Sequence, residues 1–439
     1  LCLPMIGFGQ IWDFTYVTPA FDLNKVHFLN DTLGFSIGDN GIILKTTDGG
    51  DNWSIVNSGT TNDLVDIKFY NDSIGYISSK DDGILTGGNG NGGTLLKTID
   101  SGNSWNIYYM HYGDMDYNSI GLIIAPNTVL EEIYIFGSNS YDDLVLFSIT
   151  NGVTTNGSFP NINESNITLS NNLYANASYM ASENTYFVVG SQGAGQSYGT
   201  FRKIGGVNMP TNGPDYISLS DLKVINGSQR CIIAGNAFAF SGSGGRIYEF
   251  NNMWNQNNFQ MTVNSFTSPH SFNSIDMSGQ FGWVVGDGGT VVSTIDSGYT
   301  WNNYTNSNFE NLNSVFMLDG CKGWIVGENG IIGRYRYEEE ISVSLCENSQ
   351  NLSLFSLLDS NAINLGGVWT DSTGNPISYL INPNTLSIGT HSFYYTFYIC
   401  NEVKESIVNV TINELPNLTT TVLNNVACYG NNTGMAQVN

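Results

Sequence analysis

The sequence predicts an all-β fold, namely a seven-bladed β-propeller followed by a small β-sandwich. A turn motif occurs three times, a short strand ending in glycine recurs seven times, and the chain contains 13% aromatic residues and 50 glycines. Aromatic residues favour strands and glycine favours tight turns. With 439 residues, the chain is long enough for about three domains.

The turn motif reads T-x-D-[GS]-G-x-x-W and occurs at residues 46–53, 98–105 and 294–301. It is an Asp-box. The aspartate is expected to accept backbone N–H bonds, the glycine to adopt a positive φ, and the tryptophan to cover the turn. We therefore assign a structural role to Asp48, Gly50, Trp53, Asp100, Gly102, Trp105, Asp296, Gly298 and Trp301.

Around these boxes a longer unit repeats, and its clearest part is an aromatic or apolar strand that ends in or begins with glycine. The seven copies lie at residues 34–38, 75–77, 133–137, 186–190, 231–235, 282–286 and 323–327. Most have a short strand before and another after. Repeats of about 40–55 residues with four short strands are typical of propeller blades.

The last unit lacks its own Asp-box and tryptophan, and the N-terminus supplies a replacement. Trp12 lies 14 residues before Val26, as Trp301 lies 14 residues before Val315. A propeller must cover its first and last strand edges. We therefore expect residues 10–17 to close the ring as the outer strand of the last blade.

Residues 38–53 and 286–301 resemble the BNR/Asp-box propellers of the photosystem II stability and assembly factor type. The resemblance covers residues 10–337. It implies a propeller fold but is a poor guide to function, because such domains recur in exported proteins of Bacteroidetes-like bacteria.

The remaining segments suggest an exported, modular protein. Residues 1–9 resemble the tail of a signal peptide, the alternative being a buried N-terminal strand. Residues 338–340 are expected to be a linker, and residues 341–414 resemble the Ig-like modules of large Bacteroidetes surface proteins. Residues 415–439 are similar to the start of a SprB-type adhesin repeat. No other stretch approaches the roughly 18 apolar residues of a membrane span, and we expect a secreted or cell-surface location.

The charge limits the classes of partner, and the cysteines limit the disulfides and metal sites that the sequence predicts. Asp and Glu number 38 against 14 Lys and Arg, a net charge of −24, which argues against nucleic acid and anionic membranes. A disulfide between Cys346 and Cys400 is expected, whereas Cys231 and Cys321 are interpreted as small buried side chains. No cysteine or histidine spacing indicates a metal site, so neither a structural metal nor a cofactor is predicted.

A candidate ligand face is expected where the longer loops of blades 2 to 5 gather. It would carry acidic and aromatic side chains suited to sugar stacking or Ca²⁺, the alternative being ordinary solvated loops. Its residues are Asp81, Asp82, His111, Asp114, Asp116, Tyr141, Asp142, Asp143, Tyr198, Phe238 and Phe240.

Three functions remain open from the sequence. The first is a non-enzymatic binding or spacer module of an adhesin-like protein, with a glycan or a surface protein as ligand. The second is a carbohydrate-active hydrolase, although the arginine triad expected of a sialidase is missing and no catalytic residue can be assigned. The third is an assembly-factor-like scaffold.

Overall fold

The structure, a computed structural model, describes most of the chain. The described residues are 12–80, 91–112, 115–123, 132–139, 144–150, 167–170, 173–182, 185–192, 200–204, 207–210, 217–225, 230–237, 244–251, 260–304, 310–336, 339–358, 366–399, 402–415, 420–424 and 435–438. The chain divides into two compact units. One is Trp12–Arg336, and the other combines Leu1–Ile11 with Tyr337–Asn439.

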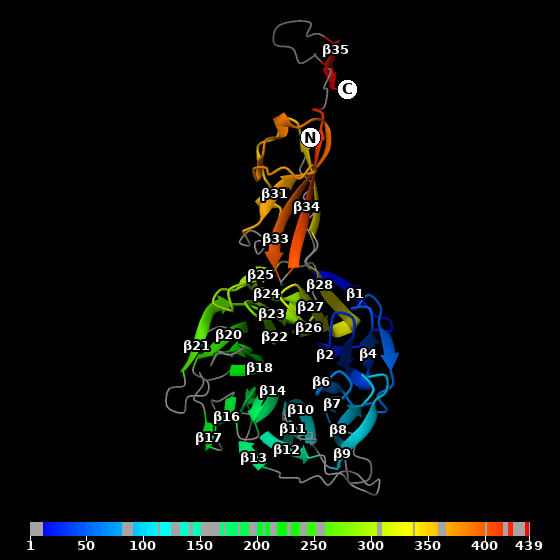
Figure 1. Ribbon diagram of the computed structural model, residues 1–439, viewed down its shortest axis with the longest axis vertical. Coiled ribbons are helices and arrows are strands. Elements are labelled where there is room, and N and C mark those ends of the chain that lie inside the picture. Colours follow the sequence, from blue (N-terminus) through cyan, green and yellow to red (C-terminus); the bar gives the residue numbers. More distant parts are fainter. Residues whose placement is uncertain are drawn as a thin grey trace. The chain divides into compact units, whose positions relative to one another are not determined.

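In the described part of the larger unit, seven four-stranded antiparallel sheets are arranged as a ring (Figure 1). Six of them use four consecutive strands, with the first strand innermost. The first three comprise β2 (Leu23–Phe28), β3 (Gly34–Gly38), β4 (Ile43–Thr46) and β5 (Ser54–Val56); β6 (Leu64–Phe69), β7 (Gly75–Ser79), β8 (Asn91–Thr98) and β9 (Asn106–Tyr112); and β10 (Met115–Ile123), β11 (Glu132–Asn139), β12 (Leu144–Thr150) and β13 (Ile167–Ser170).

The next three sheets follow the same order. They comprise β14 (Leu173–Ser182), β15 (Thr185–Gln192), β16 (Thr200–Ile204) and β17 (Val207–Pro210); β18 (Ile217–Val224), β19 (Cys231–Ala237), β20 (Gly244–Asn251) and β21 (Gln260–Thr267); and β22 (Phe272–Ser278), β23 (Phe281–Gly286), β24 (Val291–Thr294) and β25 (Asn302–Tyr304).

The last sheet joins the two ends of the unit. Its order is β1-β28-β27-β26, formed by β1 (Trp12–Tyr16), β26 (Leu312–Met317), β27 (Lys322–Gly327) and β28 (Ile331–Arg336). β1 is antiparallel to β28, and Trp12 pairs with Tyr335. The spacing of Trp12 thus located the outer strand of this sheet correctly.

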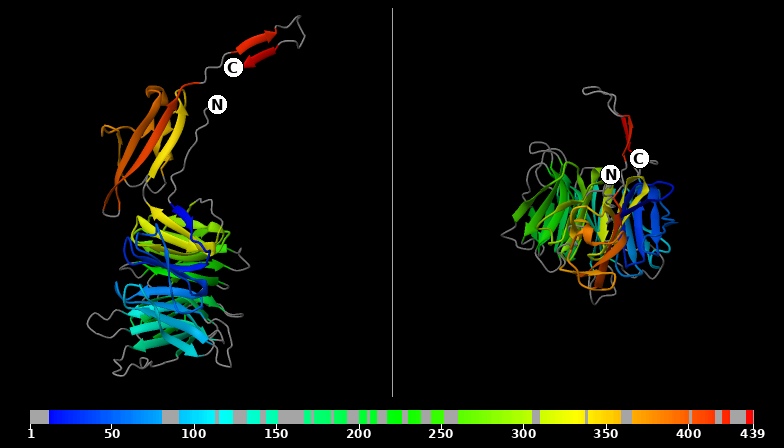
Figure 2. Two further views of the ribbon diagram at one scale, coloured as in Figure 1. Left: turned by 90° about the vertical axis from the view of Figure 1, so that its right-hand side faces the viewer. Right: turned by 90° about the horizontal axis from the view of Figure 1, so that it is seen from above.

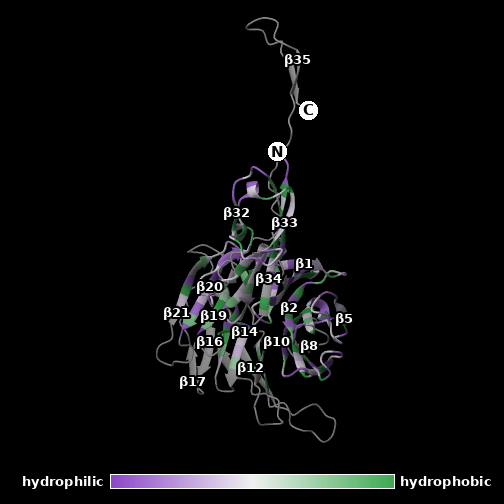
Figure 3. Ribbon diagram, turned by 45° about the horizontal axis from the view of Figure 1, so that its top comes forward, coloured by the Kyte–Doolittle hydropathy of each residue, from purple (hydrophilic) through white to green (hydrophobic). Residues whose placement is uncertain are grey.

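The core lies between neighbouring sheets, where apolar side chains of two sheets interlock. Val26 and Phe28 of the first sheet pack with Trp324 and Val326 of the last, and the rings of Phe28 and Trp324 stack 3.4 Å apart. Figure 3 shows hydrophobic residues along the strands of the ring. Ring stability therefore depends on contacts between sheets as well as within them.

The recurring glycine at the end of the second strand has a steric cause. A Cβ atom on Gly38, Gly286 or Gly327 would lie 2.0, 1.9 or 2.0 Å from a backbone carbonyl oxygen of the segment leading into the inner strand. No side chain fits there. Short 3-10 turns follow these glycines at η1 (Asp39–Gly41), η2 (Asp287–Gly289) and η3 (Glu328–Gly330).

The smaller unit contains a four-stranded sheet of order β29-β34-β33-β31, in which β29 and β34 are parallel. The strands are β29 (Glu339–Cys346), β31 (Val368–Asp371), β33 (Gly389–Ile399) and β34 (Glu402–Asn413). A second sheet pairs β30 (Leu352–Ser353) with β32 (Leu380–Ile381), and short helices η4 (Leu354–Ser356) and η5 (Pro383–Thr385) lie beside these strands in the sequence. β35 (Thr420–Asn424) and β36 (Met435–Val438) form a separate antiparallel pair, drawn in red in Figure 2.

The expected linker at 338–340 needs correction. β29 begins at Glu339, and Glu340 Oε1 accepts a hydrogen bond from Asn409 Nδ2 at 2.8 Å. Two of the three glutamates therefore belong to a paired strand. A run of like charges was a poor indicator of a linker here because alternate strand positions face solvent.

The expected Cys346–Cys400 disulfide is incompatible with the sheet register. Cys400 lies outside the described residues, but its chain neighbour Ile399 pairs with Glu402, whereas Cys346 pairs with Asn413. These positions lie at opposite ends of β34, about 36 Å apart at ~3.3 Å per residue. A disulfide requires Cα atoms within about 7 Å.

The expectations for Cys231 and Cys321 have different outcomes. Cys231 is buried and free, but Cys321 is in a disulfide, as is Cys346. Cys321 is buried, as expected, but its disulfide was not predicted. Within the described residues, no helix has both the length and the apolar character needed to cross a membrane.

Candidate functional site

Most of the candidate ligand face cannot be placed. Asp81, Asp82, Asp114, Tyr141, Asp142, Asp143, Tyr198, Phe238 and Phe240 lie outside the described residues. His111 lies in β9, the outer strand of its sheet, and Asp116 lies in β10, the inner strand of the next, with its side chain partly buried. The predicted gathering of these residues stays a prediction.

On the side of the ring where this face was expected, aspartates link the last sheet to the first and the first sheet to the second. Asp22 Oδ1 accepts the backbone N–H of Asn329 at 2.8 Å, and Asp63 Oδ1 accepts that of Asn40 at 3.0 Å. Burial raises the pKa of Asp39, with repulsion from Asp63 and Asp22 adding to it. These carboxylates already have structural partners.

A ring of asparagines reinforces this side of the molecule. Every inner strand carries a β-bulge after its first residues, and the bulge position is Asn in five of the seven, at Asn24, Asn118, Asn176, Asn273 and Asn313. Asn24, Asn273 and Asn313 donate to a backbone carbonyl of the following sheet at 3.0, 3.1 and 3.0 Å. The sequence signal, an apolar residue followed by Asn at the start of five of the seven units, was present but not recognised.

Around the centre of the ring, three buried aspartates accept hydrogen bonds that link neighbouring inner strands. Asp66, Asp221 and Asp276 each accept the N–H of their own next residue and, through Oδ2, an N–H of the following sheet. Each is less than a tenth exposed. These carboxylates therefore link the inner strands of neighbouring sheets.

Basic groups balance these central carboxylates. Lys25 Nζ lies 3.6 Å from Asp221 Oδ2, and Lys223 pairs with Asp276. Burial lowers the pKa of Lys25, but attraction to Asp221, Asp66 and Asp276 outweighs it and leaves that pKa above its usual value. Burial and nearby lysines lower the pKa of His27 to about 3, so the imidazole is neutral at physiological pH.

The three Asp-box turns share one hydrogen-bond pattern. In the first, Thr46 Oγ1 donates to Asp48 Oδ1 at 2.8 Å, Gly50 N–H donates to Thr46 Oγ1 at 2.9 Å, and Asn52 N–H donates to Asp48 Oδ1 at 2.9 Å. The same contacts occur around Asp100 and Asp296. Gly50, Gly102 and Gly298 have φ values of 93°, 69° and 82°, a region that suits glycine.

A basic side chain of the preceding sheet holds each Asp-box turn. Lys45 Nζ donates to Ser101 O at 3.0 Å and to Asn103 Oδ1 at 2.8 Å, Arg334 Nη1 donates to Asp51 Oδ1 at 2.6 Å, and Arg230 donates to Ser297 O. Arg230 also forms a two-bond pair with Glu249. These cations are therefore structural.

The Asp-box carboxylates should make stability fall in acid. Side-chain and backbone hydrogen bonds from Ser104 lower the pKa of Asp100 to about 2. A carboxyl with a lowered folded-state pKa contributes stability above its unfolded value of about 3.9 and loses it as pH falls through the folded value. Asp100→Asn should therefore be less stable than wild type at pH 6, and the difference should shrink between pH 4 and 2.

Urea denaturation at both ends of that pH range measures this difference. Asp72→Asn, an exposed carboxylate outside the motif, is the control. A difference between wild type and Asp100→Asn that stays constant across the pH range would contradict the assignment.

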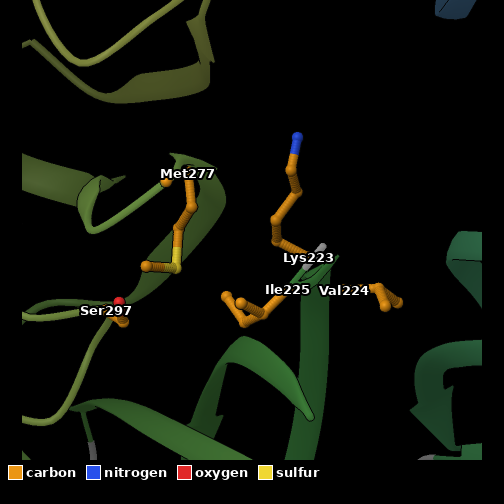
Figure 4. A pocket seen from close by; sticks show the side chains of 6 residues that line it. Lys223, Val224, Ile225, Met277 and Ser297 are labelled. Atoms are coloured by element: carbon orange, nitrogen blue, oxygen red, sulfur yellow. The ribbon is translucent and has the colours of Figure 1, made fainter. Parts of the chain in front are cut away.

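One pocket lies between the fifth and sixth sheets on the Asp-box side. It has a volume of about 240 Å³ and is lined by Lys223, Val224, Ile225, Met277, Gly279 and Ser297. Met277 and Ile225 point toward each other, and Val224 points the opposite way from Ile225 (Figure 4). The charged side chain in this lining, Lys223, is already paired with Asp276.

A second hollow runs along the outer rim between the last and first sheets, and we call it the closure groove. It has a volume of about 260 Å³ and is lined by Thr15, Tyr16, Val17, Thr18, Pro19, Phe21, Leu44, Asp51, Asn52, Trp53 and Ile55. Ile55 is 59% exposed and Tyr16 is 52% exposed. Apolar walls with a few polar groups are typical of recognition sites.

The sequence did not reveal the closure groove. Its two walls come from β1 and from the Asp-box and β5, which are about 40 residues apart and become neighbours only when the ring closes. An apolar residue at an exposed outer-strand position, Ile55, was the one available signal.

The ring of four-stranded sheets, with its inner strands about a common axis, is a β-propeller. The structure is similar to that of YCF48 bound to D1 peptide, with 16% identity and a TM-score of 0.51 over 74% of this chain and 97% of that one. It is also similar to the GH74 enzyme of Niastella koreensis, with 12% identity and a TM-score of 0.52 over 88% of this chain.

The chain spans only 59% of the GH74 enzyme. At these identities, the similarities show the fold alone. No protein-family model and no curated protein matches the chain. Among the described residues, no cluster of three or more His, Cys, Asp or Glu side chains is placed to hold a metal ion.

Proposed function

We propose that this chain is the binding part of an exported surface protein, in which a seven-bladed, non-enzymatic propeller recognises a macromolecular ligand. The closure groove carries the proposal, because it is a concave apolar surface with an exposed side chain, Ile55, that no structural role explains. The central aspartates and Asp-box carboxylates, by contrast, are used in contacts between and within sheets.

A protein ligand agrees with a known use of the fold. The YCF48 structure holds a D1 peptide, so a propeller of this size offers a surface on which a peptide can bind. A glycan is the alternative ligand.

We further propose that the smaller unit is an Ig-like sandwich that acts as a spacer. In support, Trp369 of β31 packs against Tyr395 of β33 with ring centroids 5.0 Å apart, and both side chains are buried. A buried Trp packed in the core of the sandwich is a feature of Ig-like domains. Tyr395 Oη also accepts the N–H of Gly367 at 2.9 Å.

The proposal is tested by incubating the full chain with a mixed glycan library and, separately, with a random peptide library. Bound and free pools are analysed by mass spectrometry. Ligands retained intact by wild type, and lost in an Ile55→Asp variant, would support a binding module that uses the closure groove. Glycans recovered at lower mass would overturn it in favour of a hydrolase.

A further inference from the structure

Among the residues that the structure describes, no strand pairs with the outer edge of β1. β1 is the terminal strand of its sheet, and Val17 N–H donates to Gly330 O at 2.9 Å. Because N–H and C=O groups alternate in direction along a strand, the backbones of Asp13 and Thr15 also face β28. Those of Trp12, Phe14 and Tyr16 then point away from the sheet, where a further strand could pair with them.

The closure groove lies beside the C-terminal end of this edge, because Thr15 and Tyr16 of β1 line it. Thr15 pairs with Ile332, and Ile55 of β5 pairs with Leu44. Ile332 and Leu44 belong to the same apolar cluster between the two sheets. Cross-strand partners share a face, so Thr15 and Ile55 face each other across the groove.

One end of the groove is acidic. Asp13 pairs in register with Arg334, and Arg334 Nη1 donates to Asp51 Oδ1 at 2.6 Å. Asp51 thus holds the guanidinium, and Asp13 is an exposed carboxylate at the neighbouring register position. The whole chain carries a net charge of −24, which also favours a cationic partner.

We propose that the outer edge of β1 and the closure groove together bind an extended peptide segment of another protein, a proposal that rests on the proposed binding function. The segment adds a fifth strand to the last sheet by pairing with Phe14 and Tyr16. An apolar side chain packs on Ile55, and a Lys or Arg two positions along lies near Asp13 and Asp51. Main-chain pairing supplies affinity and the groove supplies specificity.

A peptide fits these features better than a glycan. Sugar stacking needs an open aromatic face directed into the site, but Tyr16 alternates with Thr15 and so projects to the opposite face of β1. Trp53 is packed edge-on against Phe28 at 5.9 Å. The groove therefore offers a strand edge and an aliphatic wall.

The test selects a random 12-residue phage-displayed peptide library on the immobilised full chain. Enriched peptides should alternate apolar and basic residues. Ile55→Asp should weaken binding of a selected synthetic peptide about tenfold or more, the effect of about 1.4 kcal/mol. Ile99→Asp is the matched control, because Ile99 is 70% exposed at a distant Asp-box and its replacement should leave binding unchanged.

Backbone pairing is tested on the ligand itself, so no variant needs to fold. N-methylation of every second amide of the selected peptide should abolish binding in one of the two alternating sets and preserve it in the other. Equal binding by both sets, or equal binding by the Ile55→Asp chain, would overturn the proposal.

A parallel glycan array separates this inference from the proposed function. Glycans bound with no peptides enriched would overturn the inference and leave the binding module standing. Neither class bound would overturn both.

Discussion

Replacing Trp12 with alanine should lower the free energy of unfolding of the propeller by about 3–5 kcal/mol, the usual cost of truncating a buried Trp. The Trp12 side chain is 1% exposed. It packs edge-on against Trp283 at 5.2 Å and beside Tyr335 at 5.3 Å, so it joins the closing strand to the sixth sheet as well as to its own.

The loss of stability in Trp12→Ala should first affect the strands at the ring closure. Hydrogen exchange followed by mass spectrometry should show earlier exchange in β28, whose outer partner is β1, than in β15 on the far side of the ring. Trp12→Phe should cost less than alanine, because the indole Nε1 is buried and has no acceptor among the described residues.

Tyr16→Ala is the matched control for this prediction. Tyr16 lies on the same strand but is 52% exposed, so its loss should change stability by no more than about 0.5 kcal/mol. If Trp12→Ala were as stable as Tyr16→Ala, β1 would not be holding the ring closed.

The repeats allowed the propeller to be predicted because each unit has the same local requirements. A Cβ at Gly38 or Gly286 would collide with a backbone oxygen, and each Asp-box needs its Thr, Asp and Gly at fixed spacing. Such constraints act within one unit and so leave a visible pattern. The position of Trp12 allowed the closure of the ring to be predicted in the same way.

Contacts between repeat units left much weaker patterns in the sequence. The aspartates at the centre of the ring were not recognised, since Asp66 and Asp221 occur at this position in two units while Ser119 and Ser314 replace them in others. The cysteine pairing failed for a related reason. Being near the two ends of a domain in sequence says nothing about which end of a sheet each residue reaches, and β33 carries the chain to the far end from Cys346.

Replacing Asp221 with alanine is the second change with a large expected effect, again about 3–5 kcal/mol, as for breaking a buried ion pair. Asp221 Oδ2 accepts the hydroxyl of Ser274 at 2.7 Å and the N–H of Ile275 at 3.3 Å, and it lies 3.6 Å from Lys25 Nζ. Asp221 Oδ1 also accepts the N–H of Leu222 at 2.9 Å, so the substitution leaves three donors and one ammonium without their partner in the centre of the ring. Guanidinium denaturation compares the variants.

Two comparisons show whether the effect comes from the unpaired charge. Lys25→Met combined with Asp221→Leu should recover part of the loss, because no buried charge then lacks a partner. Asp31→Ala removes an ion pair with Lys322 whose aspartate is 59% exposed, and it should cost less than about 1 kcal/mol.

The pH dependence of stability distinguishes the contribution of the Lys25–Asp221 ion pair from that of packing. The folded-state pKa of Lys25 is raised above its usual 10.5, so its contribution to stability is fully present below that value and is lost as pH rises through the folded value. Wild type should therefore lose stability relative to the Lys25→Met, Asp221→Leu variant above pH 10.5. Parallel stability curves for the two proteins in that range would show that the ammonium contributes nothing, and that the cost of Asp221→Ala arises from the lost hydrogen bonds alone.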